Sequence, residues 1–376
     1  MEFLSQERVT LAGLLPGLDE LLAEQDFDVL ESDRSNAIEL FRDAGGAGLV
    51  VPSDFHGLGA SAFDAVRVQR AIGSRSPSLA VATTMHHFSA ATMIELWKIE
   101  RGFEWMLLQA VADQKMLLAS GFAEGVSGQS IFRPTMRGRR ENGSVIVSGT
   151  KKPCSLSRSM DLLTASVMID SADGEGEFAI ALIPANLPGV TIEPFWGAPV
   201  LRGAESDAVI VEEVRLDGPL VVSIDTAVST RLDGVQAVAF AWFELLITAS
   251  YLGMASALAE RVLKSERSGA LQRLAPAVEL ESAMASLEAT ARLLDEGDAS
   301  SAVLTRAVLC RYAAQDAINR AVAQSVELLG GVAFIESGEV AYYAACTQAL
   351  AFHPPGRQKN AEATVAALRG EALEMS

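Results

Sequence analysis

The amino-acid sequence predicts an α+β protein that is mostly α, with an N-terminal helical domain, a central antiparallel β domain and a C-terminal four-helix bundle. Three observations predict this order. Apolar residues recur at helical spacing up to about residue 117, short β-branched runs follow over 118–220, and long alanine- and leucine-rich segments complete the chain. We therefore expect domains that span 1–117, 118–220 and 221–376.

The first domain is predicted from two periodic segments separated by glycine-rich turns. Residues 37–42 and 65–72 carry apolar side chains at three- and four-residue spacing, which places them on one face of a helix. Glycines within 45–48 and 57–59 lie between them, where a turning chain favours residues without a side chain. This pattern predicts two helices joined by an irregular segment.

The central domain is predicted from short runs of strand-forming residues with turn signals between them. Asn142-Gly143 is one such signal and precedes a β-branched run. Short strands at intervals of ten to twenty residues are typical of a small antiparallel sheet or barrel. The predicted strands are 145–147, 162–169, 178–183, 190–192 and 208–211.

The C-terminal bundle is predicted from long apolar segments separated by helix breakers. Ser268-Gly269, Gly297-Asp298 and Gly330-Gly331 interrupt the pattern, because glycine favours the end of a helix over its interior. The predicted helices are 235–264, 276–295, 299–329 and 338–352.

The length, net charge and cysteine content of the chain exclude several classes of protein. The chain has 376 residues, long enough for two or three packed domains, and a formal net charge of −18, which argues against a nucleic-acid partner. We see no transmembrane run and no signal peptide, so we expect no membrane partner. The three cysteines follow no disulfide or zinc pattern. A cytoplasmic location and no metal site are expected.

Six motifs, in the same order along some 300 residues, resemble those of the acyl-CoA dehydrogenase superfamily. Members of this family bind a flavin between the β domain and the C-terminal bundle, so the resemblance implies the fold predicted above and a flavin cofactor. We expect FAD, with FMN or loosely bound reduced flavin as alternatives. Members assemble as homodimers or homotetramers, which we expect here. The motifs lie in 41–59, 78–86, 123–130, 149–155, 201–214 and 325–334.

The resemblance also implies cofactor contacts. Ser155 falls where the family places a hydroxyl close to flavin N5, although an ordinary strand serine is the alternative. Gly330 and Gly331 resemble a glycine pair whose backbone approaches the cofactor's pyrophosphate or ribose, and a helix end followed by a turn is the alternative. Arg267 resembles an arginine that reaches the phosphates from a neighbouring subunit. The segment from Gly253 to Arg267 is about two residues shorter than the family pattern, so a surface arginine is the alternative.

The sequence departs from the family at the catalytic base. Most members carry a glutamate in the loop that corresponds to 350–357, and this stretch contains no carboxylate. A minority carry the base on an earlier helix, at the position of Phe243. Glu244 is one residue away, and one residue turns a helix by about 100°, so Glu244 is either a displaced base or a structural carboxylate. Gln129 replaces a serine that helps to hold the acyl-CoA, and Ala123 replaces a threonine that contacts the flavin.

His353 stands in place of the missing base. Residues 351–354 resemble a sequence in the flavin-dependent monooxygenase branch of the superfamily, whose histidines steer the activated oxygen or deprotonate the substrate. A neutral imidazole suits that role. We expect His86 to face the same pocket, and Phe243, Phe352 and Gln129 to contact the substrate. The alternatives are a His353 that caps a helix end and a His86 or His87 that is packed within a helix.

Three functions remain open from the sequence. The first is a flavin oxidoreductase that acts on an acyl thioester, bound to CoA or to a carrier protein, through a non-standard base. The second is a flavin-dependent monooxygenase that hydroxylates N, S or C of a small molecule with O₂ and reduced flavin from a reductase. The third is a non-redox or catalytically silent family member.

Overall fold

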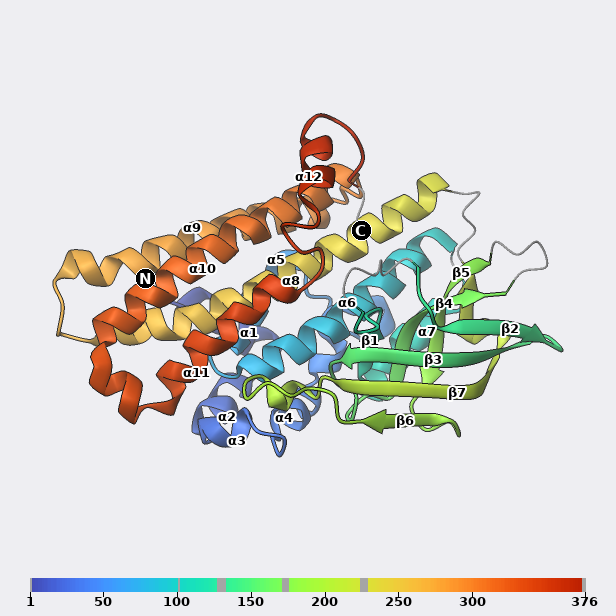
Figure 1. The fold of residues 1–376 in the computed structure, drawn as a ribbon, viewed down its shortest axis with the longest axis horizontal. Coiled ribbons are helices and arrows are strands. Elements are labelled where there is room, and N and C mark those ends of the chain that lie inside the picture. The colour runs from blue at the N-terminus through green and yellow to red at the C-terminus, as the bar shows by residue number, and fades with distance from the viewer. Residues whose placement is uncertain (1, 101, 127–132, 171–175, 224–228, 374–376) are drawn as a thin grey trace.

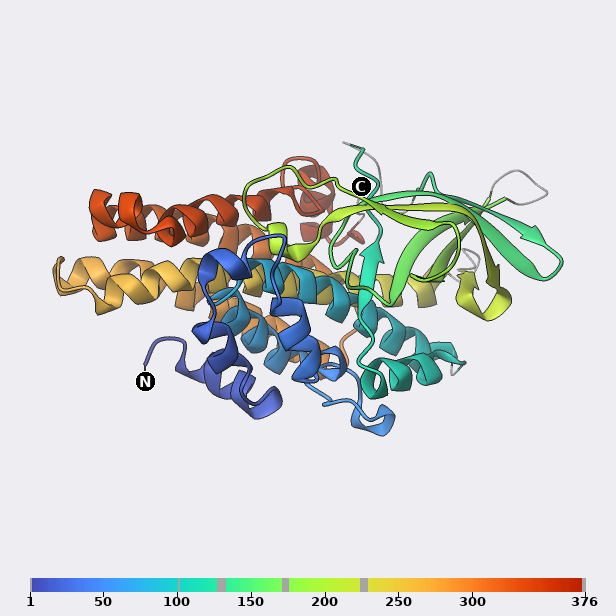
Figure 2. The ribbon, with the colours of Figure 1, turned by 90° about the horizontal axis from the view of Figure 1, so that it is seen from below.

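The chain folds into a helical part and a curved β-sheet that lie side by side (Figure 1). The computed structural model describes residues 2–100, 102–126, 133–170, 176–223 and 229–373. The sheet packs at one end of the long helices of the C-terminal bundle, and the N-terminal helices cover one side of that bundle (Figures 1 and 2). The predicted order of helices, sheet and helical bundle is confirmed.

The N-terminal helices contain both periodic segments that the sequence identified. Residues 37–42 lie in α4 and residues 65–72 in α5. The buried Arg70 of α5 ties this layer to the bundle, because its guanidinium donates to Glu7, Ser256 and Glu281. The elements are α1 (Ser5–Leu14), α2 (Leu18–Glu24), α3 (Phe27–Leu30), α4 (Ala37–Asp43), η1 (Gly46–Gly48), η2 (Ser53–Phe55), α5 (Ala62–Gly73), α6 (Pro77–Glu100) and α7 (Glu104–Asp113).

Within the described residues, the sheet has eight strands, in the order β6-β7-β3-β2-β4-β5-β8 with β1 paired to β4. All five predicted runs lie in strands, namely β3 to β7. Most pairs are antiparallel, but β4 pairs in parallel with both β1 and β2, which the antiparallel prediction did not include. The strands are β1 (Leu118–Gly121), β2 (Arg137–Glu141), β3 (Ser144–Cys154), β4 (Leu162–Ile169), β5 (Glu177–Pro184), β6 (Val190–Glu193), β7 (Asp207–Asp217) and β8 (Val221–Ser223).

Long helices form the C-terminal part of the described chain, and the predicted breaks separate or interrupt them. Gly330 has a φ of 84° and interrupts α10 with a kink. The predicted last helix is divided in two, α11 and the 3₁₀ turn η6, which leads into the loop of His353. The elements are α8 (Ser229–Lys264), α9 (Ala270–Asp295), α10 (Ser301–Glu336), α11 (Gly338–Cys346), η6 (Thr347–Phe352) and α12 (Ala361–Leu368), and the 3₁₀ turns η3 (Arg202–Ala204) and η4 (Gly218–Leu220) flank β7.

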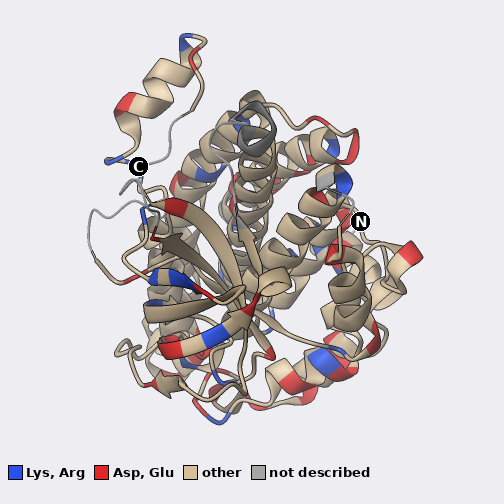
Figure 3. Cartoon of the chain, turned by 90° about the vertical axis from the view of Figure 1, so that its right-hand side faces the viewer, with Lys and Arg blue, Asp and Glu red and all other residues tan. Residues whose placement is uncertain are grey.

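Helix α8 is the central helix of the molecule. Among the described residues it alone is long and apolar enough to cross a membrane, over Gly234–Lys264, and 94% of its most apolar window is buried by the rest of the protein. This burial is that of a core helix. At the end of the molecule that carries the sheet, acidic and basic positions are interspersed along the outer strands and helices (Figure 3).

Candidate functional site

A cavity of about 220 Å³ lies where α6, α8, the sheet and the loop after η6 meet. Its walls are mostly aromatic and apolar, and Ser120, Ser155 and His353 supply polar side chains. Concave apolar sites with a few convergent polar groups are where proteins most often bind small ligands. The lining residues are Met85, Phe88, Ser120, Phe122, Ala123, Pro153, Ser155, Trp196, Phe240, Phe243, Ala349, Phe352, His353 and Pro354.

His353 is held at this cavity from two sides. The Tyr251 hydroxyl lies 3.0 Å from its Nε2, and the two rings meet edge to face. Arg311 donates from Nη1 to the His353 carbonyl oxygen at 2.8 Å and from Nη2 to the carbonyl of Pro355. The Tyr312 hydroxyl donates to the same Pro355 carbonyl at 3.2 Å. The bundle therefore fixes both the ring and the backbone of the loop.

The imidazole of His353 is neutral near physiological pH. Burial lowers its pKa to about 3, and the positive charge of Arg311 acts in the same direction. Burial also raises the pKa of Tyr251 well above its usual value, so its hydroxyl stays protonated. Tyr251 and His353 therefore form an uncharged pair that can share one hydrogen bond in either direction.

Glu244 and Arg311 form a buried ion pair behind the cavity. Both side chains are almost fully buried, and Arg311 Nε lies 2.5 Å from Glu244 Oε2. Neither carboxylate oxygen has a well-aligned hydrogen bond to any described residue. Burial raises the pKa of Glu244 to about 7, against the opposing charge of Arg311. Phe243 lines the cavity and Glu244 does not, which is the orientation that the helical register predicts.

His86 does not face this cavity, so the expectation that it lies opposite His353 needs correction. The backbone N–H of Leu118 donates to His86 Nδ1 at 3.1 Å, and Nε2 therefore donates to the Ala47 carbonyl at 2.9 Å. Both ring nitrogens join backbone segments, and burial lowers the pKa of His86 to about 4. His87 is buried beside it, packs edge-on against Phe41, and finds no hydrogen-bond partner for its ring among the described residues.

The predicted cofactor-binding residues lie in two places. Ser155 lines the cavity, and its hydroxyl lies 3.0 Å from that of Ser206. Arg267 lies beside Gly330 and donates to the Leu329 carbonyl at 3.2 Å. This second group, with Gly331, lies near the C-terminal ends of α8 and α10, which point away from the sheet (Figure 1). The structure therefore brings Arg267 and the glycines together, but not with the cavity of the same chain.

Of the predicted substrate contacts Phe352 and Gln129, the structure describes only Phe352. Phe352 lines the cavity mouth and is 84% exposed. Gln129 lies outside the described residues, so its expected role stays a prediction. Ala123, where the family pattern has a threonine, lines the cavity.

Several residues of the site were missed by reasoning from the sequence. Trp196, Phe122 and Phe88 supply aromatic walls, and no local pattern distinguishes them from core residues. Arg311 could have been predicted as a buried residue with a charged partner, because it is a cation within the otherwise apolar stretch 308–314. A cation on such a face points to a buried partner, and the partner here is Glu244.

No cluster of three or more His, Cys, Asp or Glu side chains suited to a metal ion occurs among the described residues. The buried carboxylate of Glu124 has protein partners. Glu124 pairs with the fully buried Lys151 at 2.7 Å and accepts from the backbone of Thr135 and Met136. This arrangement fixes the turn before β2 against β3, beside the cavity.

Comparison with known proteins identifies relatives along the full length of the chain. It is 42% identical over 380 residues to isobutylamine N-hydroxylase of Streptomyces viridifaciens, an alignment that covers 100% of both chains. It is 23% identical over 312 residues to an acyl-CoA dehydrogenase of Mycobacterium tuberculosis, covering 78% of each chain. No family model matches the sequence.

The fold is shared with solved structures. TdsC from Paenibacillus sp. A11-2, solved with FMN and indole, superimposes with a TM-score of 0.82 at 16% identity, over 98% of this chain and 99% of that one. The order of helices, sheet and bundle thus agrees with the resemblance found in the motifs. The chain belongs to the acyl-CoA dehydrogenase superfamily of flavoenzymes, as an atypical member homologous to isobutylamine N-hydroxylase.

Proposed function

We propose that this protein is a flavin-dependent monooxygenase that hydroxylates the nitrogen of a small amine with O₂ and reduced flavin. The observation that carries the proposal is the makeup of the cavity. Among the described residues that line it there is a neutral histidine and no aspartate or glutamate. An acyl-thioester dehydrogenase needs a carboxylate within reach of the substrate's α-proton. That reaction, the first expectation from the sequence, therefore has less support than the monooxygenase.

The full-length similarity to an N-hydroxylase supports the same choice. Amine and thioester substrates place opposite demands on a site. Dehydrogenation requires a base at carbon, whereas N-hydroxylation requires that the amine be bound with its lone pair free and that water be kept out. A cavity with mostly aromatic and apolar walls and a neutral imidazole meets the second set of demands.

The residues present fit a flavin. The cavity offers flat aromatic surfaces at Trp196 and Phe243 and a hydroxyl at Ser155, which suit a planar ring with polar edges. The phosphates of a flavin need cations or bare backbone, and Arg267 beside Gly330 offers both. Because that group lies away from the cavity of its own chain, it would serve a cofactor held by another copy. When bound, the flavin supplies the activation of O₂.

His353 is the residue we propose for contact with the substrate. Its Nε2 is paired with Tyr251, and no hydrogen bond from the described residues reaches Nδ1. Nδ1 can therefore accept a hydrogen bond from, or donate one to, a ligand in the cavity. Tyr251 holds the ring and Arg311 holds the backbone, so both act as positioning residues. Burial, together with the charge of Arg311, lowers the pKa of His353 and keeps the imidazole neutral.

The test is oxygen consumption with product analysis. The purified chain is supplied with a flavin reductase, NAD(P)H and either FMN or FAD, and isobutylamine is added. We expect amine-dependent oxygen uptake and a product heavier by one oxygen atom. The matched comparison mixes flavin-loaded protein with acyl-CoA thioesters in the absence of oxygen. Bleaching of the flavin by a thioester, with no product from the amine, would show a dehydrogenase instead.

A further inference from the structure

The hydroxyl of Tyr251 decides which nitrogen of His353 carries the proton. Tyr251 is fully buried, and among the described residues its hydroxyl reaches one hydrogen-bond partner, His353 Nε2 at 3.0 Å. If Nε2 carried the proton, the imidazole would donate to Tyr251, and the phenolic proton would be left without an acceptor. An unpaired buried donor is unfavourable. Tyr251 therefore donates to Nε2, and the proton of the neutral ring lies on Nδ1.

Nδ1 is the ring nitrogen that remains for a ligand. His353 lines the larger cavity, and no described residue forms a hydrogen bond with its Nδ1. The ring is neutral, because burial and the nearby charge of Arg311 lower the pKa of His353 to about 3. A neutral imidazole that accepts at one nitrogen donates at the other. The cavity therefore receives an N–H donor from the loop after η6.

A second donor arises in the same way at Ser155. Its hydroxyl lines the cavity and lies 3.0 Å from the hydroxyl of Ser206, which is 5% exposed. Among the described residues, the Ser206 hydroxyl reaches no other acceptor. Ser206 therefore donates to Ser155, and the proton of Ser155 is left for a ligand. The segment after β3 thus adds an O–H donor to the N–H donor of His353.

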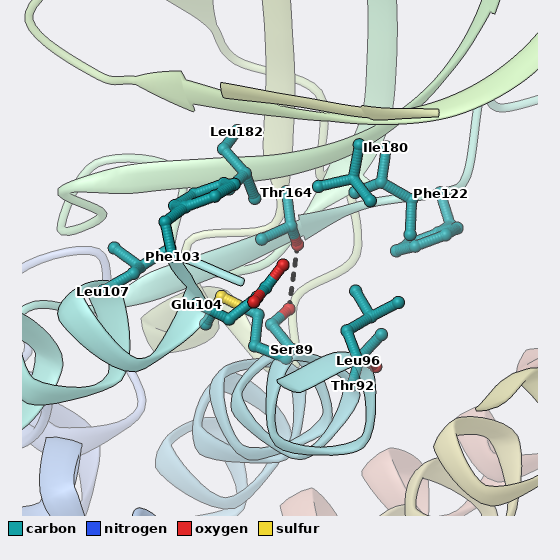
Figure 4. A pocket seen from close by; sticks show the side chains of 12 residues that line it. Ser89, Thr92, Leu96, Phe103, Glu104, Leu107, Phe122, Thr164, Ile180 and Leu182 are labelled. Atoms are coloured by element: carbon teal, nitrogen blue, oxygen red, sulfur yellow. Dashed lines mark hydrogen bonds between the residues drawn. The ribbon is translucent and has the colours of Figure 1, made fainter. Parts of the chain in front are cut away.

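No carboxylate balances these donors inside the cavity. The described residues that line it include no aspartate or glutamate. Glu104 points into a separate small cavity between α6, α7 and the sheet, and Phe122 lines both cavities (Figure 4). Glu244 lies behind the larger cavity and is paired with Arg311. A cation in the larger cavity would meet donors and apolar walls, and burial of an uncompensated charge is strongly unfavourable.

We propose that Tyr251 fixes His353 as an Nδ1–H donor, and that the donor-lined cavity therefore takes up its substrate amine in the uncharged, free-base form. This inference rests on the proposed function and names the protonation state that the site accepts. An ammonium group has only N–H donors, whereas the free base also has a lone pair that can accept from Nδ1–H.

The same lone pair is used in the reaction. N-hydroxylation joins the nitrogen lone pair to one oxygen atom of O₂, one N–H proton moves to that oxygen, and the other oxygen atom leaves as water with two electrons from reduced flavin. When the N–O bond forms, the lone pair leaves Nδ1–H, and this donor passes to the new hydroxyl oxygen. His353 thus holds its proton throughout, and Tyr251 is the residue that keeps it on Nδ1.

The tautomer is measured on the full chain without substrate. The four histidines are labelled with a nitrogen isotope, and comparison with His353→Ala identifies the signals of His353. Solid-state NMR near neutral pH should show a protonated Nδ1 and an unprotonated Nε2. In Tyr251→Phe the donor to Nε2 is removed, so we expect the proton to redistribute between the two nitrogens. Tyr343→Phe is the matched control, because it removes a buried hydroxyl that donates to the Ser74 carbonyl and does not line the cavity.

Two NMR results would overturn the assignment. A proton on Nε2 in the wild type contradicts it directly, and that measurement does not depend on the folding of any variant. Unchanged His353 signals in a folded Tyr251→Phe would show that Tyr251 does not set the tautomer.

The charge state of the bound amine is measured by calorimetric titration of the protein with oxidised FMN. Isobutylamine is an ammonium ion near neutral pH, and its free-base fraction rises roughly tenfold for each pH unit between about pH 7 and about pH 9. We expect its Kd to fall by the same factor. Trifluoroethylamine is the comparison, because fluorine makes its ammonium form much more acidic and leaves the free base dominant. Its Kd should stay constant over this range.

The fluorinated amine also separates titration of the ligand from titration of the protein. The titratable and charged groups that face His353 and Tyr251 are Glu244 of α8, Arg311 and Tyr312 of α10, and Cys346 of α11. Burial raises the pKa of Glu244 to about 7, close to this range, and its ionisation would change the Kd of both amines alike. Parallel profiles for the two amines, or a constant Kd for isobutylamine, would overturn uptake of the free base.

Failure of this inference and failure of the proposed function give different results, because neither measurement requires turnover. If hydroxylated product forms while Nε2 carries the proton or the ammonium ion binds, the inference is wrong and the function stands. If Nδ1–H and free-base binding are found but no oxygenated product forms, the proposed function is wrong and the inference stands.

Discussion

Replacing Glu244 by glutamine should stabilise the protein above neutral pH and leave its stability unchanged in mild acid. Glu244 is fully buried against Arg311, and burial raises its pKa from 4.5 to about 7. A carboxyl group with a raised pKa favours the folded state below pH 4.5, and that contribution is lost as the pH rises through 7. The glutamine side chain resembles the protonated carboxyl group at every pH, so the variant does not lose stability as the pH rises.

The magnitude follows from the pKa difference. The difference between about 7 and 4.5, at about 1.4 kcal/mol for each pKa unit, gives about 3 kcal/mol. The entropy of unfolding scales with chain length, so for 376 residues this free energy corresponds to roughly 4 °C in Tm. We therefore expect Glu244→Gln to melt at the wild-type temperature near pH 5 and roughly 4 °C higher near pH 8.

Differential scanning calorimetry between about pH 5 and pH 8 makes the measurement. Glu260→Gln is the control with the opposite sign. Burial raises the pKa of Glu260, but Arg8 and Lys264 outweigh that effect and lower it to about 2, so its stabilisation is present throughout this range. Its variant should be less stable by the same amount at each pH. If Glu244→Gln is instead destabilised at high pH, the ion pair with Arg311 stabilises the fold on balance and the reasoning fails.

Three further variants test the site and the bundle. His353→Ala should lower turnover by roughly a hundredfold or more, the usual contribution of a proton-handling side chain, while flavin binding and Tm hold; near-normal turnover would contradict its proposed role. Arg311→Met leaves the His353 carbonyl without its donor, the Pro355 carbonyl with Tyr312 alone, and Glu244 without its counter-charge, so we expect a loss of about 3 kcal/mol or more in urea unfolding, and no loss would mean that the loop is held otherwise. Gly330→Ala puts a side chain where φ is 84° and ψ is 166°, which should cost about 1–3 kcal/mol and lower Tm, and an unchanged Tm would show that the kink relaxes.

The fold could be predicted from the sequence where the local pattern matches the tertiary role. The β-branched runs of β3, β4, β5 and β7 are such cases, because most of their side chains are buried in the sheet. The sequence pattern did not predict β2, because this strand carries three arginines whose side chains face solvent. It did not predict β8 either, because that strand has only three residues. The predicted helix break at Gly330 corresponds to a kink in α10, because a φ of 84° favours glycine.

The site could be predicted only in part, since its contacts come from distant segments. The helical register of α8 alone was enough to predict that Glu244 faces away from the cavity and Phe243 faces toward it. It was not enough for His86, whose orientation depends on the Ala47 carbonyl and the Leu118 amide, neither of which belongs to its helix.

The hydrogen bonds from Arg311 to two backbone carbonyls affect which residues near the cavity can be substituted. A backbone contact does not depend on the identity of the side chain, so the path of the loop is set by the bundle. Neighbouring positions such as Phe352, which is 84% exposed at the cavity mouth, can then be replaced without displacing His353. Libraries at that position are a direct route to new substrate ranges on an unchanged scaffold.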